Sequence, residues 1–146
     1  MQIKKVTAKD LDTLAPLFDG YMVFYRQASN IEAHKRFLSE RIQNKEAEIF
    51  IALSNENQGM GFTLLYPSFS SVSQSRIYTL NDLFVHPSHR KKGVASALME
   101  AAKAYAKKTG AVRLHLETEA SNTQAQRLYE KEGWNRETNF FYSINV

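Results

Sequence analysis

Apolar residues recur along the chain in two kinds of pattern, one typical of helices and one typical of strands, in segments that alternate. A spacing of three and four residues predicts four helices, one with apolar positions from Leu11 to Tyr25 and others over about 30–44, 93–109 and 122–132. Short runs rich in β-branched and aromatic residues predict strands at 2–7, 48–53, 61–66, 77–85, 112–117 and 140–146. The polar segment 54–58 predicts a hairpin turn, and the serine-rich segment 67–75 predicts a loop.

The predicted helices have recognisable end signals. A Ser or Thr followed three residues later by a polar or acidic residue is typical of a capping box, and this spacing occurs at Thr7 and Asp10, Ser29 and Glu32, and Ser121 and Gln124. Gly110 and Gly133 follow the last two helices, where a left-handed residue commonly ends a helix.

The order of elements predicts an α/β (α+β) fold, with a central mixed sheet that has helices on both faces. The chain has 146 residues, of which 43% are hydrophobic, so we expect a single domain over 1–146 with a core of its own. It shows no internal repeat and no linker-like segment.

Composition excludes several classes of function. The chain has no cysteine, so disulfides, a cysteine nucleophile and thiolate metal sites are impossible. It has no apolar run long enough for a membrane span, and the amino-terminal residues lack the apolar core of a secretory signal, which favours a cytoplasmic protein without a membrane partner. The net charge of +4 is modest, and no nucleic-acid recognition motif accompanies it.

The most informative segment is 83–98, in which an apolar strand leads through a basic loop into an alanine-rich helix. The first turn of a helix has backbone N–H groups without helical partners and a partial positive charge, so it can bind a phosphate. Gly93 allows close approach of a ligand, and Arg90, Lys91 and Lys92 add charge. The loop lacks the three glycines of the dinucleotide fingerprint and the Gly-Lys-Ser/Thr end of the P-loop. It suits a pyrophosphate.

Two motifs together resemble those of the GNAT superfamily of N-acyltransferases. The first is Arg90-x-x-Gly93-x-Ala95 after the strand that ends at Val85. The second is the segment 117–134, in which Asn122 precedes a helix that carries Tyr129 and ends before Gly133. Both occur in the order found in that family. The resemblance implies the GNAT fold, with a twisted, mostly antiparallel sheet of six to seven strands.

The resemblance also implies a cosubstrate, acetyl-CoA, and the residues that bind it. The strand ending at Val85 would splay from the strand containing Leu116, and its backbone would pair with pantetheine. The loop and helix start would bind the pyrophosphate, and Asn122 would hold the pantetheine arm. The implied cofactor-binding residues are Leu83, Phe84, Val85, Arg90, Lys91, Lys92, Gly93, Val94, Ala95, Ser96 and Asn122.

Transfer of an acetyl group to an amine poses two proton problems. The acceptor amine must lose a proton before it attacks, and the leaving thiolate benefits from a proton donor. Tyr129 is predicted as the general acid, because the resemblance places this tyrosine near the thioester sulfur. Glu117 is predicted as the general base, with Asp82 and Glu119 as alternatives. Many relatives carry a glutamate earlier on the strand before the loop, where this chain has Thr79.

The acceptor side of the fold implied by the resemblance is rich in aromatic residues. The candidate substrate residues are Tyr21, Tyr25, Arg26, Tyr66, Phe69 and Asp82. Their pattern is similar to that of the Hpa-like branch of the superfamily and suggests a polyamine, an amino acid or a basic peptide as the acceptor. His86 and His89 lack a third metal ligand, so no metal is expected. A homodimer is compatible with the apolar terminal strand, and the alternative function is a non-catalytic acyl-CoA sensor or interaction module of the same fold.

Overall fold

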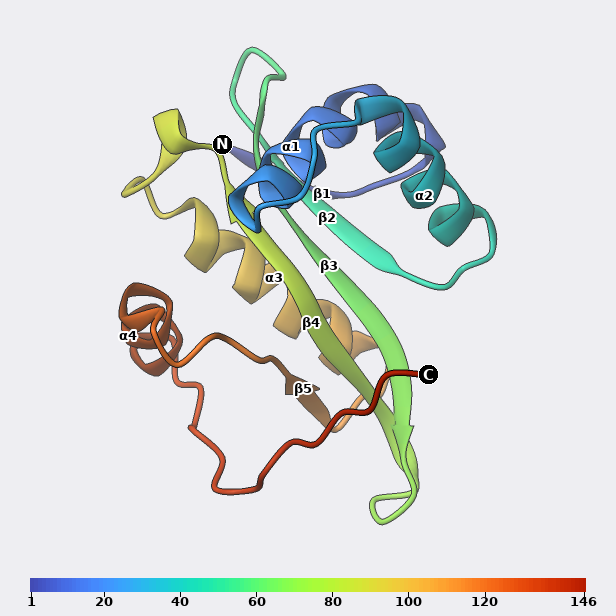
Figure 1. Cartoon of the computed structure of the whole chain (residues 1–146), viewed down its shortest axis with the longest axis vertical. Helices are drawn as coiled ribbons and strands as arrows, with labels where there is room; N and C mark the ends of the chain where they lie inside the picture. The colour runs from blue at the N-terminus through green and yellow to red at the C-terminus, as the bar shows by residue number, and fades with distance from the viewer. The chain divides into compact units, whose positions relative to one another are not determined.

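The computed structural model describes residues 1–146 and divides into two compact units, Met1–Leu116 and Glu117–Val146. The first unit holds a sheet of five strands in the order β1-β2-β3-β4-β5. The strands are β1 (Gln2–Lys5), β2 (Glu48–Leu53), β3 (Gly59–Ser70), β4 (Ser75–Val85) and β5 (Arg113–His115). The helices of this unit are α1 (Leu11–Phe24), α2 (Ile31–Gln43) and α3 (Val94–Lys108), which Figure 1 labels together with the strands, and the short 3-10 helices η1 (Ala8–Asp10) and η2 (Pro87–His89).

The sheet is mixed, with one parallel pair. The strands from β1 to β4 pair antiparallel with their neighbours, whereas β4 and β5 pair in parallel. The parallel pairing joins Ile77–Thr79 to Arg113–His115 and goes no further, although β4 continues to Val85. From Leu80 onward, β4 therefore has β3 as its only strand partner, and its other edge is open to a different hydrogen-bonding partner.

Helices cover both faces of this sheet, as the alternation of elements predicts. On one face, Phe62 of β3 packs against Phe18 of α1 with ring centroids 5.8 Å apart. On the other face, Tyr78 of β4 packs against Tyr105 of α3 at 5.8 Å. The largest buried cluster lies between the sheet and α1 and α2, and it includes Leu14, Leu38 and Ile51, which are fully buried.

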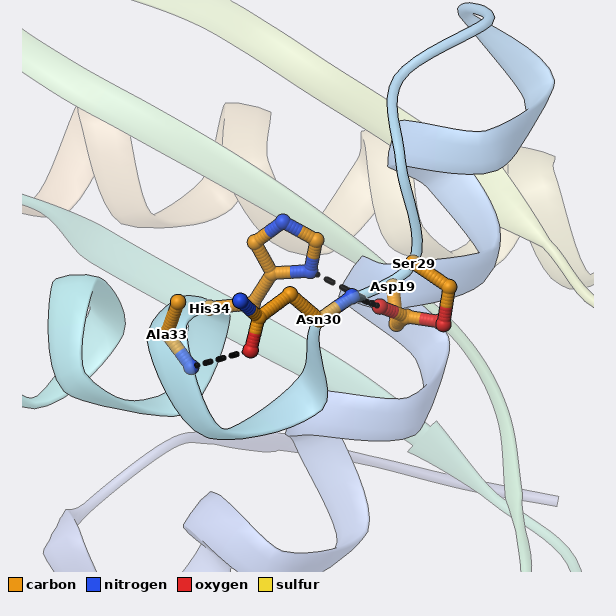
Figure 2. Close-up of polar contacts among 5 residues, drawn as sticks. All are labelled: Asp19, Ser29, Asn30, Ala33 and His34. Atoms are coloured by element: carbon orange, nitrogen blue, oxygen red, sulfur yellow. Dashed lines mark hydrogen bonds and ion pairs between the residues drawn. The ribbon is translucent and has the colours of Figure 1, made fainter.

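A buried carboxylate joins α1 to α2. Asp19 of α1 is 8% exposed and accepts hydrogen bonds from the Ser29 hydroxyl (2.7 Å) and the Asn30 backbone N–H (2.8 Å), and His34 Nδ1 lies 2.9 Å from it (Figure 2). The expected capping box of Ser29 and Glu32 is wrong. Asn30 caps α2 instead by accepting from the Ala33 N–H at 3.1 Å, because the Ser29 hydroxyl is directed to Asp19.

The hairpin between β3 and β4 is longer than the sequence predicts. Segment 67–75 was expected to be a loop, yet β3 extends to Ser70 and β4 begins at Ser75. Pro67 is compatible with a strand here because β2 stops pairing with β3 at Leu65, so Pro67 lies where β3 has a partner on one side only. The predicted strand at 112–117 is shorter, since β5 covers Arg113–His115.

The second unit contains α4 (Thr123–Lys131). Its amino-terminal cap is Asn122, which accepts from the Ala125 N–H at 3.2 Å, so the expected capping box of Ser121 and Gln124 is wrong. The predicted left-handed residue after the helix is confirmed, because Gly133 has φ +84°. The N–H of Trp134 donates to the carbonyl of Tyr129, and that of Gly133 donates to Glu130, which makes a Schellman motif.

The strand expected at 140–146 is absent, and the sheet has five strands rather than six to seven. Apolar residues of this segment are exposed, among them Phe140, Tyr142 and Ile144. The alternation of apolar and polar residues in this segment is weak. A strand also needs a neighbouring strand edge for its hydrogen bonds, so the local pattern alone does not decide whether a strand forms.

Candidate active site

The basic loop between β4 and α3 has the geometry of an anion site. Gly93 has φ +76° and is the amino-terminal cap of α3, where it has no side chain to fill the space in front of the helix. The first helical hydrogen bond runs from the Ala97 N–H to the Gly93 carbonyl. Lys91 also has a positive φ of 59°, so two left-handed residues turn the loop before the helix begins. The arrangement directs the start of α3 toward the loop and supports binding of a phosphate there.

Two of the cationic side chains in this loop also stabilise its conformation by donating hydrogen bonds to backbone carbonyls. Arg90 Nε donates to the Val85 carbonyl at 3.1 Å, and Lys92 Nζ donates to the Ser88 carbonyl at 3.0 Å. These bonds fix the side chains near the end of β4 and the start of α3. Arg90, Lys91 and Lys92 are all exposed, so their charges are accessible to an anionic ligand.

Close packing of β3 and β4 positions the start of α3. A Cβ on Gly61 would lie 2.5 Å from the Phe84 carbonyl oxygen and 3.3 Å from Val94 Cγ1. Only glycine fits between these groups. Val94 is 2% exposed, so the first residue of α3 is anchored in the core while the loop before it is exposed.

A β-bulge in β4 determines which face carries Asp82. Leu64 pairs with Asp82 and Leu65 with Leu80, so Asn81 is an additional residue in β4. In a regular strand, Tyr78 and Asp82 would share the α3 face. The additional residue reverses the alternation, and Asp82 faces Tyr21 of α1.

Asp82 is a buried carboxylate with neutral hydrogen-bond donors. It is 4% exposed, the Tyr21 hydroxyl donates to it, and Asn81 Nδ2 donates to its Oδ1 at 3.0 Å. Burial raises the pKa of Asp82 above its ordinary value, since the two donors offset the loss of hydration only in part. Burial and the nearby Asp82 carboxylate raise the pKa of Tyr21 and of Tyr66 in turn.

The structure brings together most of the predicted acceptor residues. Tyr21 and Tyr66 both interact with Asp82, and the rings of Tyr21 and Tyr25 lie 4.8 Å apart. Arg26 follows α1 in a left-handed conformation with φ +62°. Phe69 is separate from this group. It lies five residues beyond the Asp82 partner Leu64 on β3, which is about 17 Å along a strand, and the Arg76 guanidinium lies over its ring at 5.2 Å.

The second unit carries the other predicted residues. The side-chain oxygen of Asn122 caps α4, which leaves its amide N–H groups as the donors for a ligand. Tyr129 lies on α4 with its ring 6.3 Å from that of Trp134. Glu117 and Glu119 are both exposed, unlike Asp82.

The sequence pattern does not predict the polar cluster around Asp19. An aspartate on an amphipathic helix carries no signal of burial, and Ser29 fits a helix cap equally well. The cluster contains Ser, His and Asp, but both Ser29 and His34 contact the Asp19 carboxylate. A nucleophilic serine must instead bond to its histidine base, so this geometry joins two helices and does not activate Ser29.

Two further observations concern metals and membranes. His86 and His89 have ring centroids 6.0 Å apart, and the structure contains no group of three or more His, Cys, Asp or Glu residues placed to hold a metal ion. None of the helices combines the length and the apolar character that crossing a membrane requires.

The fold and the loop define a class of protein, and comparison with known families identifies it. Residues 14–134 match the model of the acetyltransferase (GNAT) family. The chain therefore belongs to the GNAT acetyltransferase family, as the two sequence motifs predict.

Relatives support this assignment along the whole chain. An uncharacterized N-acetyltransferase of Bacillus subtilis, YhfO, is 48% identical over 100% of this chain and 98% of its own length. A probable acetyltransferase of Haemophilus influenzae is 32% identical, with 78% of each chain covered. The crystal structure of a probable acetyltransferase, 40% identical, superposes with a TM-score of 0.95 over 100% of this chain and 98% of that chain.

A more distant structure shows the shared fold. The aminoglycoside N-acetyltransferase AAC(6')-Iy, solved in complex with CoA, is 22% identical and has a TM-score of 0.83 over 99% of this chain and 95% of that chain.

Proposed function

We propose that this protein transfers an acetyl group from acetyl-CoA to a primary amine by direct attack within a ternary complex. The observation that carries the proposal is the loop at the start of α3, in which Gly93 caps the helix without a side chain and three cations lie beside it. Membership of the GNAT family and the fold shared with a CoA-bound acetyltransferase support acetyl-CoA as the cosubstrate.

In this proposal, the loop and the first turn of α3 bind the pyrophosphate of CoA through residues 90–96. The backbone of Leu83, Phe84 and Val85 binds the pantetheine arm along the edge of β4 that β5 leaves open. An N–H group of this edge also stabilises the oxyanion that forms when the amine attacks the thioester carbonyl. Asn122 contributes an amide N–H to the same arm.

Two residues carry the proton transfers. At pH 7 only about one primary amine in a few thousand is neutral, and reaching the nucleophilic form costs about 4 to 5 kcal/mol, so a base is useful. Glu117 is our candidate base, and Asp82 is the alternative that burial favours. Tyr129 is the candidate general acid, which protonates the departing CoA thiolate. A cytoplasmic location and the formation of a homodimer remain predictions from the sequence.

The first test is release of free thiol from acetyl-CoA with a panel of polyamines, amino acids, aminoglycosides and lysine peptides. We expect amine-dependent release that falls by about 10² or more in Tyr129→Phe with unchanged affinity for CoA, because phenylalanine keeps the ring beside Trp134 and removes only the acidic hydroxyl. Tyr142→Phe, at an exposed tyrosine of the same unit, is the matched control. Turnover of Tyr129→Phe equal to that of the control would remove Tyr129 from the mechanism.

A pH profile tests the base. Glu117→Gln should abolish the acidic limb of the profile of kcat/KM, and Glu119→Gln serves as its control. If the acidic limb stays in place in Glu117→Gln, another group is the general base, and Asp82 is the next residue to test. If no amine supports thiol release although CoA binds tightly, the result favours the alternative function, a non-catalytic acyl-CoA sensor, over the enzyme.

A further inference from the structure

A buried threonine contacts the backbone of β4 directly beside the bulge. Residues 60–65 of β3 are all buried, and Thr63 is the only one of them with a polar side chain. It is 0% exposed, and its hydroxyl donates to the Asp82 carbonyl at 2.9 Å. Valine would fill the same space without a hydroxyl that needs a partner, so packing does not account for a threonine here. The hydroxyl serves the Asp82 carbonyl.

Thr63 reaches this carbonyl from the face of the sheet opposite to the Asp82 carboxylate. Phe62 packs against Phe18 of α1, so the alternation along β3 directs Thr63 to the face that α3 covers. Asp82 is the first residue after the bulge, where the ladder between β3 and β4 is locally disrupted. The bond from Thr63 therefore fixes the backbone of β4 at the point where regular pairing resumes, without involving the carboxylate.

The N–H group that follows this carbonyl points to the open edge of β4. The His86 N–H donates to the Met60 carbonyl at 2.9 Å, so it points toward β3. Successive residues of a strand direct their N–H groups to opposite edges, and Leu83 is three residues earlier, so its N–H points away from β3. The Val85 carbonyl has the same direction and accepts from Arg90 Nε in the loop.

Peptide geometry couples the direction of the Asp82 carbonyl to that of the Leu83 N–H. The two groups belong to one planar trans peptide, in which C=O and N–H point in opposite directions. Thr63 holds the carbonyl on the β3 side and thereby holds the N–H on the open edge, to which we assign the pantetheine arm and the oxyanion. An oxyanion donor is effective when its direction is fixed before the reaction.

We propose that Thr63 is a positioning residue, which directs the Leu83 N–H at the oxyanion formed from the thioester carbonyl. This inference deepens the proposed function and rests on it for the position of the oxyanion. Thr63 itself touches neither the acetyl group nor the amine in this scheme, and it acts through the peptide between Asp82 and Leu83.

The first measurement removes the hydroxyl and keeps the shape of the side chain. In Thr63→Val we expect kcat and kcat/KM to fall together by about 10- to 100-fold, with KM for acetyl-CoA within about twofold of the wild-type value, because a misdirected donor weakens only the transition state. Thr63→Ser, which keeps the hydroxyl, should recover kcat to within about threefold. Thr109→Val is the matched control, because its hydroxyl donates to the Tyr105 and Ala106 carbonyls of α3.

A second measurement follows the N–H group itself and needs no turnover. The ligand is the ketone analogue of acetyl-CoA, in which a CH2 group replaces the sulfur so that an amine cannot cleave it. In NMR spectra of isotope-labelled protein, the Leu83 amide proton should move downfield with this analogue relative to CoA, in the wild type and in Thr63→Ser. In Thr63→Val we expect at most about half of this shift. The Val85 amide, on the same edge but outside the peptide that Thr63 holds, is the internal control.

Four results would overturn this role. One is equal kcat in Thr63→Val and Thr109→Val, and another is a Leu83 shift that is the same in Thr63→Val as in the wild type. The third is a raised KM for acetyl-CoA without a fall in kcat, which would make Thr63 a support for cosubstrate binding alone. The fourth needs no variant, since absence of the Leu83 shift in the wild-type protein would show that this N–H does not meet the carbonyl. Retained CoA affinity shows that each variant is folded.

Failure of the proposed function looks different. If the Leu83 shift depends on Thr63 but no amine accepts an acetyl group, the positioning role stands and the enzyme is wrong. If amines are acetylated equally fast by Thr63→Val and by the wild type, the enzyme stands and the positioning role is wrong.

Discussion

Asp19 and Asp82 are buried to a similar extent, but their surroundings differ. Asp19 is 8% exposed and Asp82 4%. Asp19 has three partners, a hydroxyl, a backbone N–H and His34, and these hydrogen bonds hold its pKa below the ordinary value despite burial. Asp82 has two neutral donors, and burial raises its pKa.

Burial of an aspartate therefore serves two different purposes in this protein. At Asp19 the protein provides enough donors to make the charged form favourable, so the carboxylate stabilises the connection between α1 and α2. At Asp82 it leaves the charge partly uncompensated beside the segment that we assign to cosubstrate binding. A polar group whose partners are incomplete is a common mark of a functional site.

The largest expected effect is the loss of stability on removing Asp19. In Asp19→Ala the Ser29 hydroxyl, the Asn30 N–H and the His34 ring lose their common acceptor, so we expect the free energy of unfolding to fall by about 2 to 4 kcal/mol in urea titrations. Asp12→Ala, which removes an exposed ion pair with Lys35, should change it by less than about 1 kcal/mol. A loss at Asp19 no greater than that at Asp12 would contradict a structural role for the cluster.

The pH dependence of stability should have opposite signs at the two aspartates. The folded-state pKa of Asp19 lies below 3.8, so its contribution is present above that pH and disappears as the pH falls through the folded-state pKa. The folded-state pKa of Asp82 lies above 3.8, so its contribution is present at low pH and disappears as the pH rises through that pKa.

Urea titrations of Asp19→Asn and Asp82→Asn between pH 3 and 7 measure this difference. Relative to the wild type, Asp82→Asn should gain stability as the pH rises and Asp19→Asn should lose it, each with a slope of at most about 1.4 kcal/mol per pH unit. Because Tyr21 and Tyr66 have raised pKa values, neither titrates in this range. Slopes of the same sign would show that the two carboxylates are equivalent.

The smallest effects come from a matched pair of hydroxyl deletions. Ser29→Ala and Tyr21→Phe each remove one hydroxyl donor from one aspartate, and each should cost about 1 kcal/mol of stability. Each deletion also removes a donor that favours the charged form of its carboxylate, so Tyr21→Phe should raise the pKa of Asp82 further and Ser29→Ala should raise that of Asp19. Stability equal to that of the wild type in either variant would show that its hydroxyl does not stabilise that carboxylate.

Much of the fold follows from local signals in the sequence. The helical periodicity places α1, α2, α3 and α4 close to their observed bounds, and β2 extends over the predicted 48–53. Gly110 and Gly133 have the left-handed conformations that their positions after the helices favour. The family was recognisable because its motifs are contiguous in sequence, so the residues of the loop before α3 and of α4 could be named before any contact was known.

Other features depend on contacts that no local pattern contains. The sequence predicted caps at Ser29 and Ser121, but Asn30 and Asn122 cap the helices. Segment 67–75 forms strand ends because β3 and β4 pair with each other, and segment 140–146 forms no strand despite its apolar residues. In each case, the outcome depends on which partner accepts or donates a hydrogen bond.

The sequence by itself determined the family, the order of the elements and the candidates for cosubstrate binding, because these depend on residue type and spacing along the chain. Tertiary structure alone decided that Asp19 joins two helices and that Asp82 faces α1. The register of β3 and β4 places one additional residue before Asp82, and that bulge reverses its face. Burial, hydrogen-bond partners and the resulting pKa are properties of that arrangement and not of the residue.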